Sequence, residues 1–172
     1  MTLQDKIIET ARSYIGQEET PNNSGFKNSW FQTLMISIGW LKGQSWCAYF
    51  AKLVWHDSLL NIDPVGANLI LKYANGSSLN TYQNFLRSKE FHVQTNPVAG
   101  ALVIFREGNE TSGHEGVVTT FDLIGFNFVS GNTSKAGSRE GTTVLEKYRQ
   151  LNLPFNPNGL NLVGFVNPIR IA

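Results

Sequence analysis

The pattern of hydrophobic and polar residues predicts helices in the first half of the chain. Apolar residues recur at helical spacing from 3 to 15, and Thr2 can cap this helix with Asp5 three residues on. The apolar stretch from 30 to 40 predicts a second, short helix that ends near its last glycine. A further helix is expected over Thr81 to Lys89.

A third helix is expected to begin in the stretch SWCAYF, residues 45 to 50, which holds the only cysteine of the chain. One helical stripe carries the apolar residues Trp46, Phe50, Leu53 and Val54. Ser45 stands where an N-cap residue belongs, so Cys47 is predicted to lie in the first turn of this helix.

The second half of the chain predicts strands instead. Three segments rich in β-branched and aromatic residues, separated by turn signals, predict an antiparallel meander: ALVIF (101–105), EGVVTTF (115–121) and FNFVS (126–130). TTVLEKY and LVGFV are candidate additional strands. Helices followed by strands imply an α+β fold, with N-terminal helices packed on a C-terminal antiparallel β-sheet. No repeat or linker divides the chain, so we expect a single domain over 1–172.

Composition narrows the classes of partner. A hydrophobic fraction of 41% and a charged fraction of 16% are typical of a folded domain, and a net charge of +1 gives no footprint for nucleic acid. No apolar run approaches the roughly 20 residues of a membrane span. Asp5 and Glu9 interrupt the run that a signal peptide would need, so we expect synthesis in the cytoplasm without one.

Cys47 has two interpretations. A thiol in the first helical turn lies in the partial positive charge of the helix N-terminus, which stabilises a thiolate and suits a nucleophile. Free cysteine is also among the most buried residue types and packs as a small hydrophobic side chain. Position alone leaves both interpretations open.

A nucleophilic cysteine needs a base, and the chain has three histidines. His56 lies nine residues after Cys47 on the same helix, about 13 Å away by helical rise, and is expected to be a helix-face residue. His92 precedes a turn-like stretch and is expected to be a solvated strand-end residue. His114 opens a strand after a glycine, where a side chain can project from the sheet rim into a cleft.

The hairpin after His114 shows which residue could lie beside this histidine and orient it. If its turn is centred between residues 123 and 124, His114 falls opposite residue 133, within a residue or two, and Asn132 is its near neighbour. An amide oxygen that accepts from one imidazole nitrogen would complete a relay of Cys47, His114 and Asn132. Asn132 alone would be interpreted as a turn residue in the left-handed region. Alternation along the strand sends Glu115 to the opposite face, outside this relay.

Other candidate site residues are close to Cys47. The backbone N–H of Cys47 could stabilise an oxyanion, and Gln44 could offer a side-chain amide. Trp46 could line a substrate groove, although its helical spacing also suits a core residue. The paired short-range spacings of zinc sites are missing, so we predict no metal and no cofactor.

Three motifs in order carry a resemblance to a known family. WCAYF opening a helix, GHEGVV opening a strand and SGNTS after the next strand resemble the CHAP-type branch of the NlpC/P60-like cysteine peptidoglycan hydrolases. The early IGQEE and NNSG stretches and the late GSREG are similar to one subgroup of small phage and bacterial cell-wall amidases. Many CHAP members have an acidic residue two positions before the asparagine, where this chain has Ser130.

The resemblance implies a papain-like NlpC/P60 fold with Cys47 as nucleophile, His114 as general base and then acid, and Asn132 as the orienting residue. It implies hydrolysis of a peptidoglycan amide bond through a thioester, by an N-acetylmuramoyl-L-alanine amidase or a peptidoglycan endopeptidase. Some relatives bind calcium in an acidic loop ahead of the cysteine, but LKGQSW contains no Asp or Glu.

Two rival functions stay open. The same fold and chemistry could belong to a protein-directed cysteine protease or acyltransferase, and Ser130 leaves room for a catalytically degenerate module that binds the cell wall. A wall hydrolase without a signal peptide acts after export, injection or lysis. A holin-dependent phage lysis system, a secretion apparatus and an immunity protein are therefore the partners to consider beside the peptidoglycan substrate.

Overall fold

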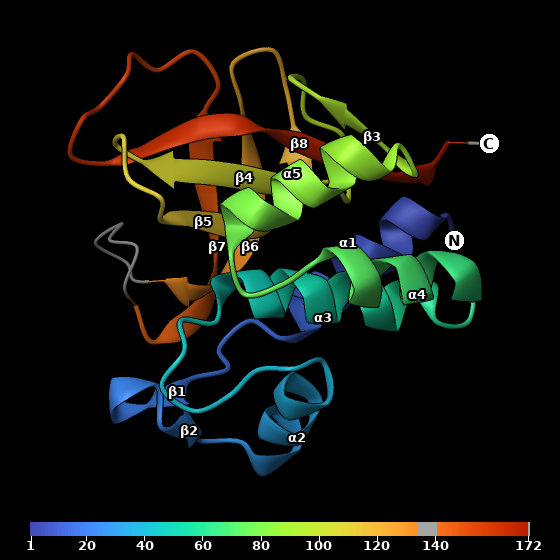
Figure 1. The fold of residues 1–172 in the computed structure, drawn as a ribbon, viewed down its shortest axis with the longest axis vertical. Coiled ribbons are helices and arrows are strands. Elements are labelled where there is room, and N and C mark those ends of the chain that lie inside the picture. Colours follow the sequence, from blue (N-terminus) through green and yellow to red (C-terminus); the bar gives the residue numbers. More distant parts are fainter. Residues whose placement is uncertain (134–140, 172) are drawn as a thin grey trace.

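The computed structural model describes residues 1–133 and 141–171, so Ser134 of SGNTS and residues 137–140 of GSREG lie outside the described residues. Within them, five α-helices accompany a six-stranded antiparallel sheet (Figure 1). The helices are α1 (Leu3–Ser13), α2 (Ser29–Ser37), α3 (Cys47–Leu59), α4 (Pro64–Tyr73) and α5 (Ser78–Ser88). The expected α+β class is confirmed. No helix in the described ranges is long and apolar enough to span a bilayer.

The sheet has the strand order β3-β8-β4-β5-β6-β7. Its strands are β3 (Phe91–Gln94), β4 (Leu102–Glu107), β5 (Gly113–Phe121), β6 (Gly125–Thr133), β7 (Thr143–Gln150) and β8 (Leu160–Arg170). The predicted meander is confirmed as β4, β5 and β6, and both additional strands exist as β7 and β8. A separate pair, β1 (Glu19–Thr20) and β2 (Gly25–Phe26), flanks the 3-10 turn Pro21–Asn23.

The structure confirms the predicted N-cap of α1 and corrects the predicted N-cap of α3. Thr2 Oγ1 accepts from the Asp5 amide at 3.1 Å and the Asp5 carboxylate accepts from the Thr2 amide at 3.0 Å, which confirms the predicted cap. α3 begins at Cys47, which confirms that this residue lies in the first turn, but the prediction of Ser45 as the N-cap is wrong. Trp46 occupies that position and makes no side-chain cap bond, because an indole has no acceptor for a helix amide, and its ring packs in the core.

The middle of the chain holds elements that the hydrophobic pattern did not predict. α4 starts where Asp63 Oδ1 accepts from the Gly66 amide at 3.0 Å, with Pro64 in the first turn. α5 begins at Ser78, three residues earlier than expected, because Ser77 Oγ accepts from the Asn80 amide. β3 was not predicted either.

The sheet separates two hydrophobic clusters. The larger one lies between the sheet and the helices and includes Leu102, Val117 and Val129 together with Phe50 and Val54 of α3. The smaller cluster lies on the opposite face of the sheet, and its members are Ala101, Val103, Phe105, Val118, Phe126, Phe128 and Phe165. Successive residues of a strand point to opposite faces, so the position along β5 decides which cluster a side chain meets.

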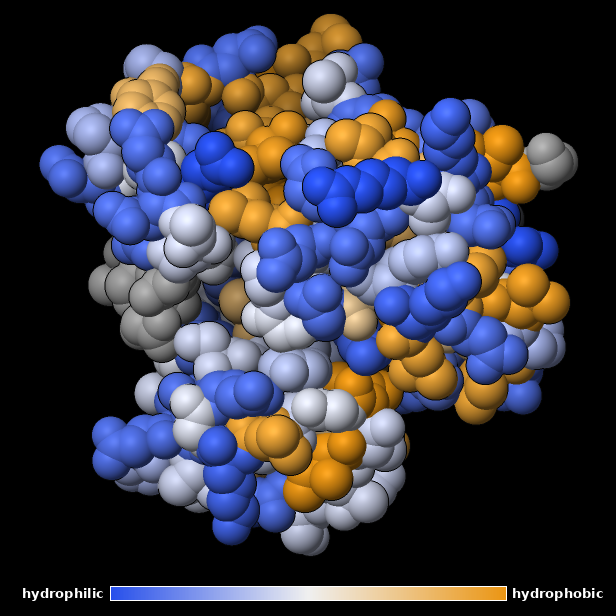
Figure 2. Space-filling view, in the orientation of Figure 1, coloured by the Kyte–Doolittle hydropathy of each residue, from blue (hydrophilic) through white to orange (hydrophobic). Residues whose placement is uncertain are grey.

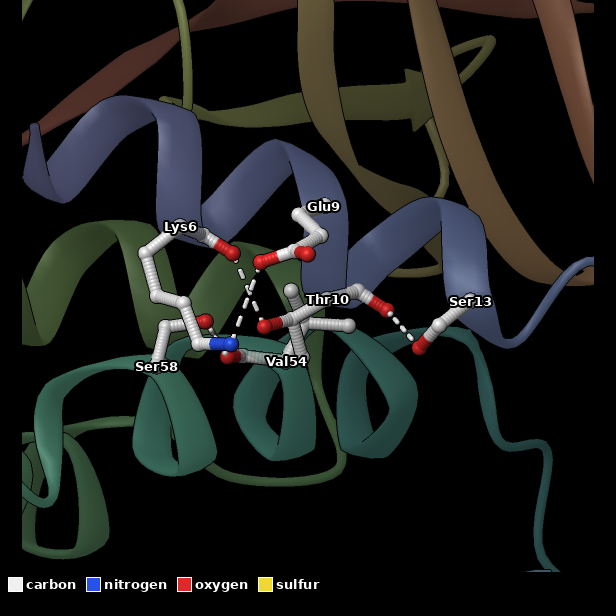
Figure 3. A network of polar contacts seen from close by, with 6 residues as sticks. All are labelled: Lys6, Glu9, Thr10, Ser13, Val54 and Ser58. Carbon is white, nitrogen blue, oxygen red and sulfur yellow. Dashed lines mark hydrogen bonds and ion pairs between the residues drawn. The ribbon is translucent and has the colours of Figure 1, made fainter. Parts of the chain in front are cut away.

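α1 packs against α3 along a seam in which hydroxyl groups bond back to their own helices (Figure 3). Thr10 Oγ1 donates to the Lys6 carbonyl at 2.8 Å, and Ser58 Oγ donates to the Val54 carbonyl at 2.6 Å. These bonds satisfy the hydroxyl of Thr10, which is half-buried, and that of Ser58, which is buried. Lys6 also pairs with Glu9 at 3.2 Å at the solvent edge. On the face shown in Figure 2, hydrophobic and hydrophilic residues are interspersed.

Trp46 fixes the N-terminal end of α3. Its side chain is fully buried, its ring packs edge-on against Phe26 with centroids 5.0 Å apart, and its indole N–H donates to Glu19 Oε2 at 2.5 Å. Gly131 of β6 lies under the same ring, since a Cβ there would come within 2.3 Å of Trp46 Cζ3. This close approach of β6 to α3 requires glycine.

We expect Gly131→Ala to lower the free energy of unfolding by about 1–3 kcal/mol, because the added methyl overlaps the Trp46 ring in a packed core. Urea denaturation followed by tryptophan fluorescence measures the change. Thr120→Ala, at an exposed position of β5, serves as the control. A Gly131→Ala variant as stable as the control would contradict the packing described for Trp46.

Candidate active site

A cavity of about 200 Å³ lies at the N-terminal end of α3. Four segments line it through Ser45, Cys47, Gly76, Ser77, Ser78, Thr111, Ser112, Gly113 and Asn132. The structure therefore brings two of the predicted site residues, Cys47 and Asn132, to one cavity. All of its lining residues are uncharged types or the thiol, so the lining suits an uncharged portion of a ligand.

Cys47 is the first residue of α3 and is 5% exposed. The Phe50 amide donates to the Trp46 carbonyl at 2.8 Å, which closes the first turn of the helix. The amides of the residues before Phe50 have no acceptor within the helix, and they add their partial positive charge to this end. Such an environment stabilises a thiolate and offers donors to an oxyanion.

The loop that carries Gly76 forms a fixed wall of the cavity. Asn75 Oδ1 accepts from the Ser77 amide at 2.8 Å, and Thr81 Oγ1 accepts from the Asn75 amide at 3.0 Å. Gly76 packs on Tyr49, two residues after Cys47, since a Cβ at Gly76 would lie 2.6 Å from the Tyr49 ring. The wall is thus held against the same helix that carries the thiol.

Asn132 reaches the cavity through a β-bulge. The register between β6 and β7 shifts between Ser130 and Thr133, and Asn132 has a left-handed backbone with φ 51°. Gly131 already faces α3, and the bulge brings the next residue to the same cavity as Cys47. Asparagine tolerates this backbone better than most residues, and its side chain here is only 1% exposed.

His114 lines a different cavity, of about 150 Å³. Its partner across the β4–β5 ladder is Phe105, whose ring centroid lies 6.4 Å from the imidazole centroid. Phe105 belongs to the smaller cluster, so His114 projects from the sheet face opposite α3. Gly113, immediately before it, lines the Cys47 cavity. Gly113 and His114, consecutive residues at the start of β5, therefore line two different cavities.

The hairpin register was predicted closely. Phe121 pairs with Phe126, as the expected turn centre requires, and a shift between Val118 and Thr120 then changes the register by one residue. The described β5–β6 ladder ends at Val117 and Val129, three residues short of His114. Beyond that point the β-bulge at Asn132 interrupts the regular alternation of β6, which counting from the turn does not reveal.

Glu115 lies on the face of β5 opposite His114, as predicted, and this is the face that packs on α3. Its side chain is fully buried, and neither carboxyl oxygen has a hydrogen-bond partner among the described residues. Burial raises the pKa of Glu115 well above its ordinary value. The sequence could have indicated this burial. Glu115 lies two residues before Val117, on the same face of a strand that has apolar residues on both faces.

Gln44 and Trp46 do not line the Cys47 cavity. Gln44 is exposed, and its Oε1 accepts from the Leu41 amide at 3.2 Å, which stabilises the turn before α3. Trp46 is fully buried, so its ring belongs to the core rather than to a substrate groove. The Gln44 side chain thus bonds to the turn before α3, and the Trp46 ring packs in the core beside the start of that helix.

The remaining polar candidates lie elsewhere. His56 on α3 is 3.5 Å from the Asp57 carboxylate, and His92 is exposed on β3. Ser130, where CHAP members often have an acid, is fully buried, and its hydroxyl has no hydrogen-bond partner in the described part of the chain. Across residues 1–133 and 141–171, no group of three or more His, Cys, Asp or Glu side chains could hold a metal ion.

Comparisons with protein-family models, with curated proteins and with solved structures find no match to this chain.

We expect Glu115→Gln to change how stability depends on pH. The native state holds the Glu115 proton above the ordinary pKa of 4.5, whereas the unfolded state releases it. The free energy of unfolding should therefore fall by up to about 1.4 kcal/mol per pH unit as the pH rises from 4.5 towards the raised pKa.

Glu115→Gln should remove this slope, while Glu110→Gln, at an exposed position, should retain it. Urea denaturation between about pH 4 and pH 8 measures the slope of both variants. This interval covers about three units above the ordinary pKa of a glutamate. Identical slopes in the wild type and Glu115→Gln would show that the carboxyl is not buried as described.

Proposed function

We propose that this chain is a cell-wall hydrolase of the papain-like CHAP type, which cleaves an amide bond of peptidoglycan with Cys47 as its nucleophile. The observation that carries the proposal is the position of Cys47 as the first residue of a buried helix, on a cavity that it shares with Asn132. The order of the three motifs along the chain supports it.

In the proposed reaction, His114 accepts the thiol proton of Cys47, the resulting thiolate attacks the carbonyl carbon of the amide, and a carbon–sulfur bond forms. Amide N–H groups at the start of α3 stabilise the negative oxygen of the tetrahedral intermediate. The carbon–nitrogen bond then breaks, the amine leaves with a proton donated by His114, and a thioester remains. Water attacks the thioester after giving a proton to His114, and the carboxylic acid is released with the regenerated thiol.

In this proposal His114 serves as the base, and its imidazole contacts the Cys47 thiol past the N-terminal end of β5. Gly113 directly precedes His114 and lines the Cys47 cavity. Catalytic hydrogen bonds are often long in unliganded enzymes and shorten when substrate binds. Asn132 then orients the substrate or the imidazole from the cavity side.

The walls of the Cys47 cavity favour a neutral substrate group. Hydroxyl side chains come from Ser45, Ser77, Ser78, Thr111 and Ser112. Hydroxyls both donate and accept, which suits the amide and acetamido groups at the junction of glycan and stem peptide. We propose that the enzyme meets this polymer after export, injection or lysis. The partner systems named above stay hypotheses.

The catalytic proposal predicts that Cys47→Ala abolishes clearing of purified sacculi. Loss of the nucleophile should lower the rate at least about 10³-fold. Since the chain has a single cysteine, iodoacetamide should inactivate the wild type by modifying Cys47 alone. Turbidity and mass spectrometry of released muropeptides measure both effects. Undiminished release by Cys47→Ala would end the proposal.

Variants of His114 and Asn132 separate their roles. His114→Ala should lower kcat/KM by about 10²–10⁴-fold. Asn132→Gly retains the left-handed backbone and removes the amide, so activity should fall while the melting temperature holds. Asn132→Ala should lose stability as well, by roughly 1–2 kcal/mol. A fully active Asn132→Gly would limit Asn132 to shaping the bulge.

A second candidate function is a wall-binding module without catalysis. The specific observation that favours it is Ser130, which is fully buried at the position where CHAP members often have an acidic residue. Retention on sacculi without any released muropeptide would support this candidate. Digestion of a generic protein in preference to muropeptides would instead support a protein-directed protease.

A further inference from the structure

A second recess lies on the sheet face opposite the helices. A cavity of about 350 Å³ is lined by Thr95, Arg149, Leu151, Leu153, Phe155, Asn161, Leu162, Val163 and Gly164. Arg149 also lines the cavity of about 150 Å³ that holds His114, so the two cavities meet at this arginine. The connection from β7 to β8, residues 151–159, forms one wall (Figure 1).

Two cations of β7 line these cavities: Arg149 lines both, and Lys147 lines the one that holds His114. Arg149 pairs with Phe126 and Lys147 pairs with Phe128 across the β6–β7 ladder, so both side chains lie on the face of the smaller cluster. The Arg149 guanidinium lies over the Phe105 ring, 5.7 Å from its centroid. Burial lowers the pKa of both cations. Desolvation of this kind is unfavourable unless an opposite charge compensates it.

The described residues supply no such charge. Arg149 Nη2 donates to the Leu160 carbonyl, while its Nε is buried and donates to no partner within the described ranges. Neither cavity has an Asp or Glu among its described lining residues. The recess therefore combines the Arg149 guanidinium, its buried unused Nε donor and apolar walls.

We propose that this recess binds a carboxylate carried on an apolar body, with Arg149 as its principal contact. A carboxylate accepts from the edge of a guanidinium in paired hydrogen bonds, which makes use of the Nε donor. Leu151, Leu153 and Phe155 provide the apolar walls for the rest of the ligand. Lys147 adds positive charge on the same face. This site is distinct from the Cys47 cavity and does not depend on the proposed catalysis.

Titration with hexanoate, followed by isothermal calorimetry and by NMR, tests the proposal. The expected result is saturable binding with shifts at the Arg149 Nε–H and at the amides of Thr95 and Gly164. Hexanamide, the neutral isostere, should bind at least about tenfold more weakly, because it lacks the charge. Inorganic phosphate should not produce these shifts. Binding of hexanamide equal to that of hexanoate, or of phosphate alone, would overturn the assignment.

Variants locate the site. Arg149→Met retains length and apolar contact with Phe105 and should weaken hexanoate binding at least about tenfold. Arg87→Met, at an exposed position of α5, should bind as the wild type does. Arg149→Lys retains the charge without the paired donors and should bind with intermediate affinity, and it provides the test if Arg149→Met does not fold.

Inward-pointing cations on an edge strand can also prevent pairing with another chain, and β7 is an edge strand. Absence of saturable hexanoate binding to the folded wild type, together with self-association of Arg149→Met in sedimentation experiments, would assign the cations to edge protection and overturn the proposal. Cys47→Ala should bind hexanoate with unchanged affinity, which separates this site from the catalytic one.

Discussion

The burial of Trp46 at the N-terminal end of α3 is the contact on which the candidate site depends. Its ring lies between Phe26 and Gly131, and its indole N–H donates to Glu19. These contacts join the N-terminal segment, α3 and β6 at one point. Because Cys47 is the next residue, the same contacts place the thiol at the start of the helix and beside the bulge of β6.

The sheet imposes the second constraint. Its residues alternate between a large cluster under the helices and a smaller aromatic cluster on the opposite face. Glu115 and His114 are neighbours in sequence, yet the first lies beneath α3 and the second lies beside Phe105. The bulge at Asn132 turns that residue back towards Cys47. Two cavities result, one with hydroxyl walls and the other with cationic and aromatic walls.

Much of this arrangement follows from local sequence. The capped first helix, the position of Cys47 in a first turn and the turn between Phe121 and Phe126 were all predicted, because each depends on periodicity, capping or a short hairpin. Long-range packing decided the rest. Ser45 lost the N-cap position to Trp46, whose ring the core requires, and α4 lacks the clear periodic stripe that would have marked it. The face that His114 occupies depends on which side of β5 the helices cover, and no local pattern specifies that.

The central claim is that Cys47 carries the acyl group during cleavage of a wall amide. Rapid acid quenching during turnover of purified muropeptides, followed by mass spectrometry of the proteolysed enzyme, tests it most directly. The account predicts an adduct with the mass of the acyl fragment on the peptide that contains Cys47, sensitive to hydroxylamine and missing in Cys47→Ala. Release of product by the wild type and by Cys47→Ala at equal rates, without any adduct, would contradict it.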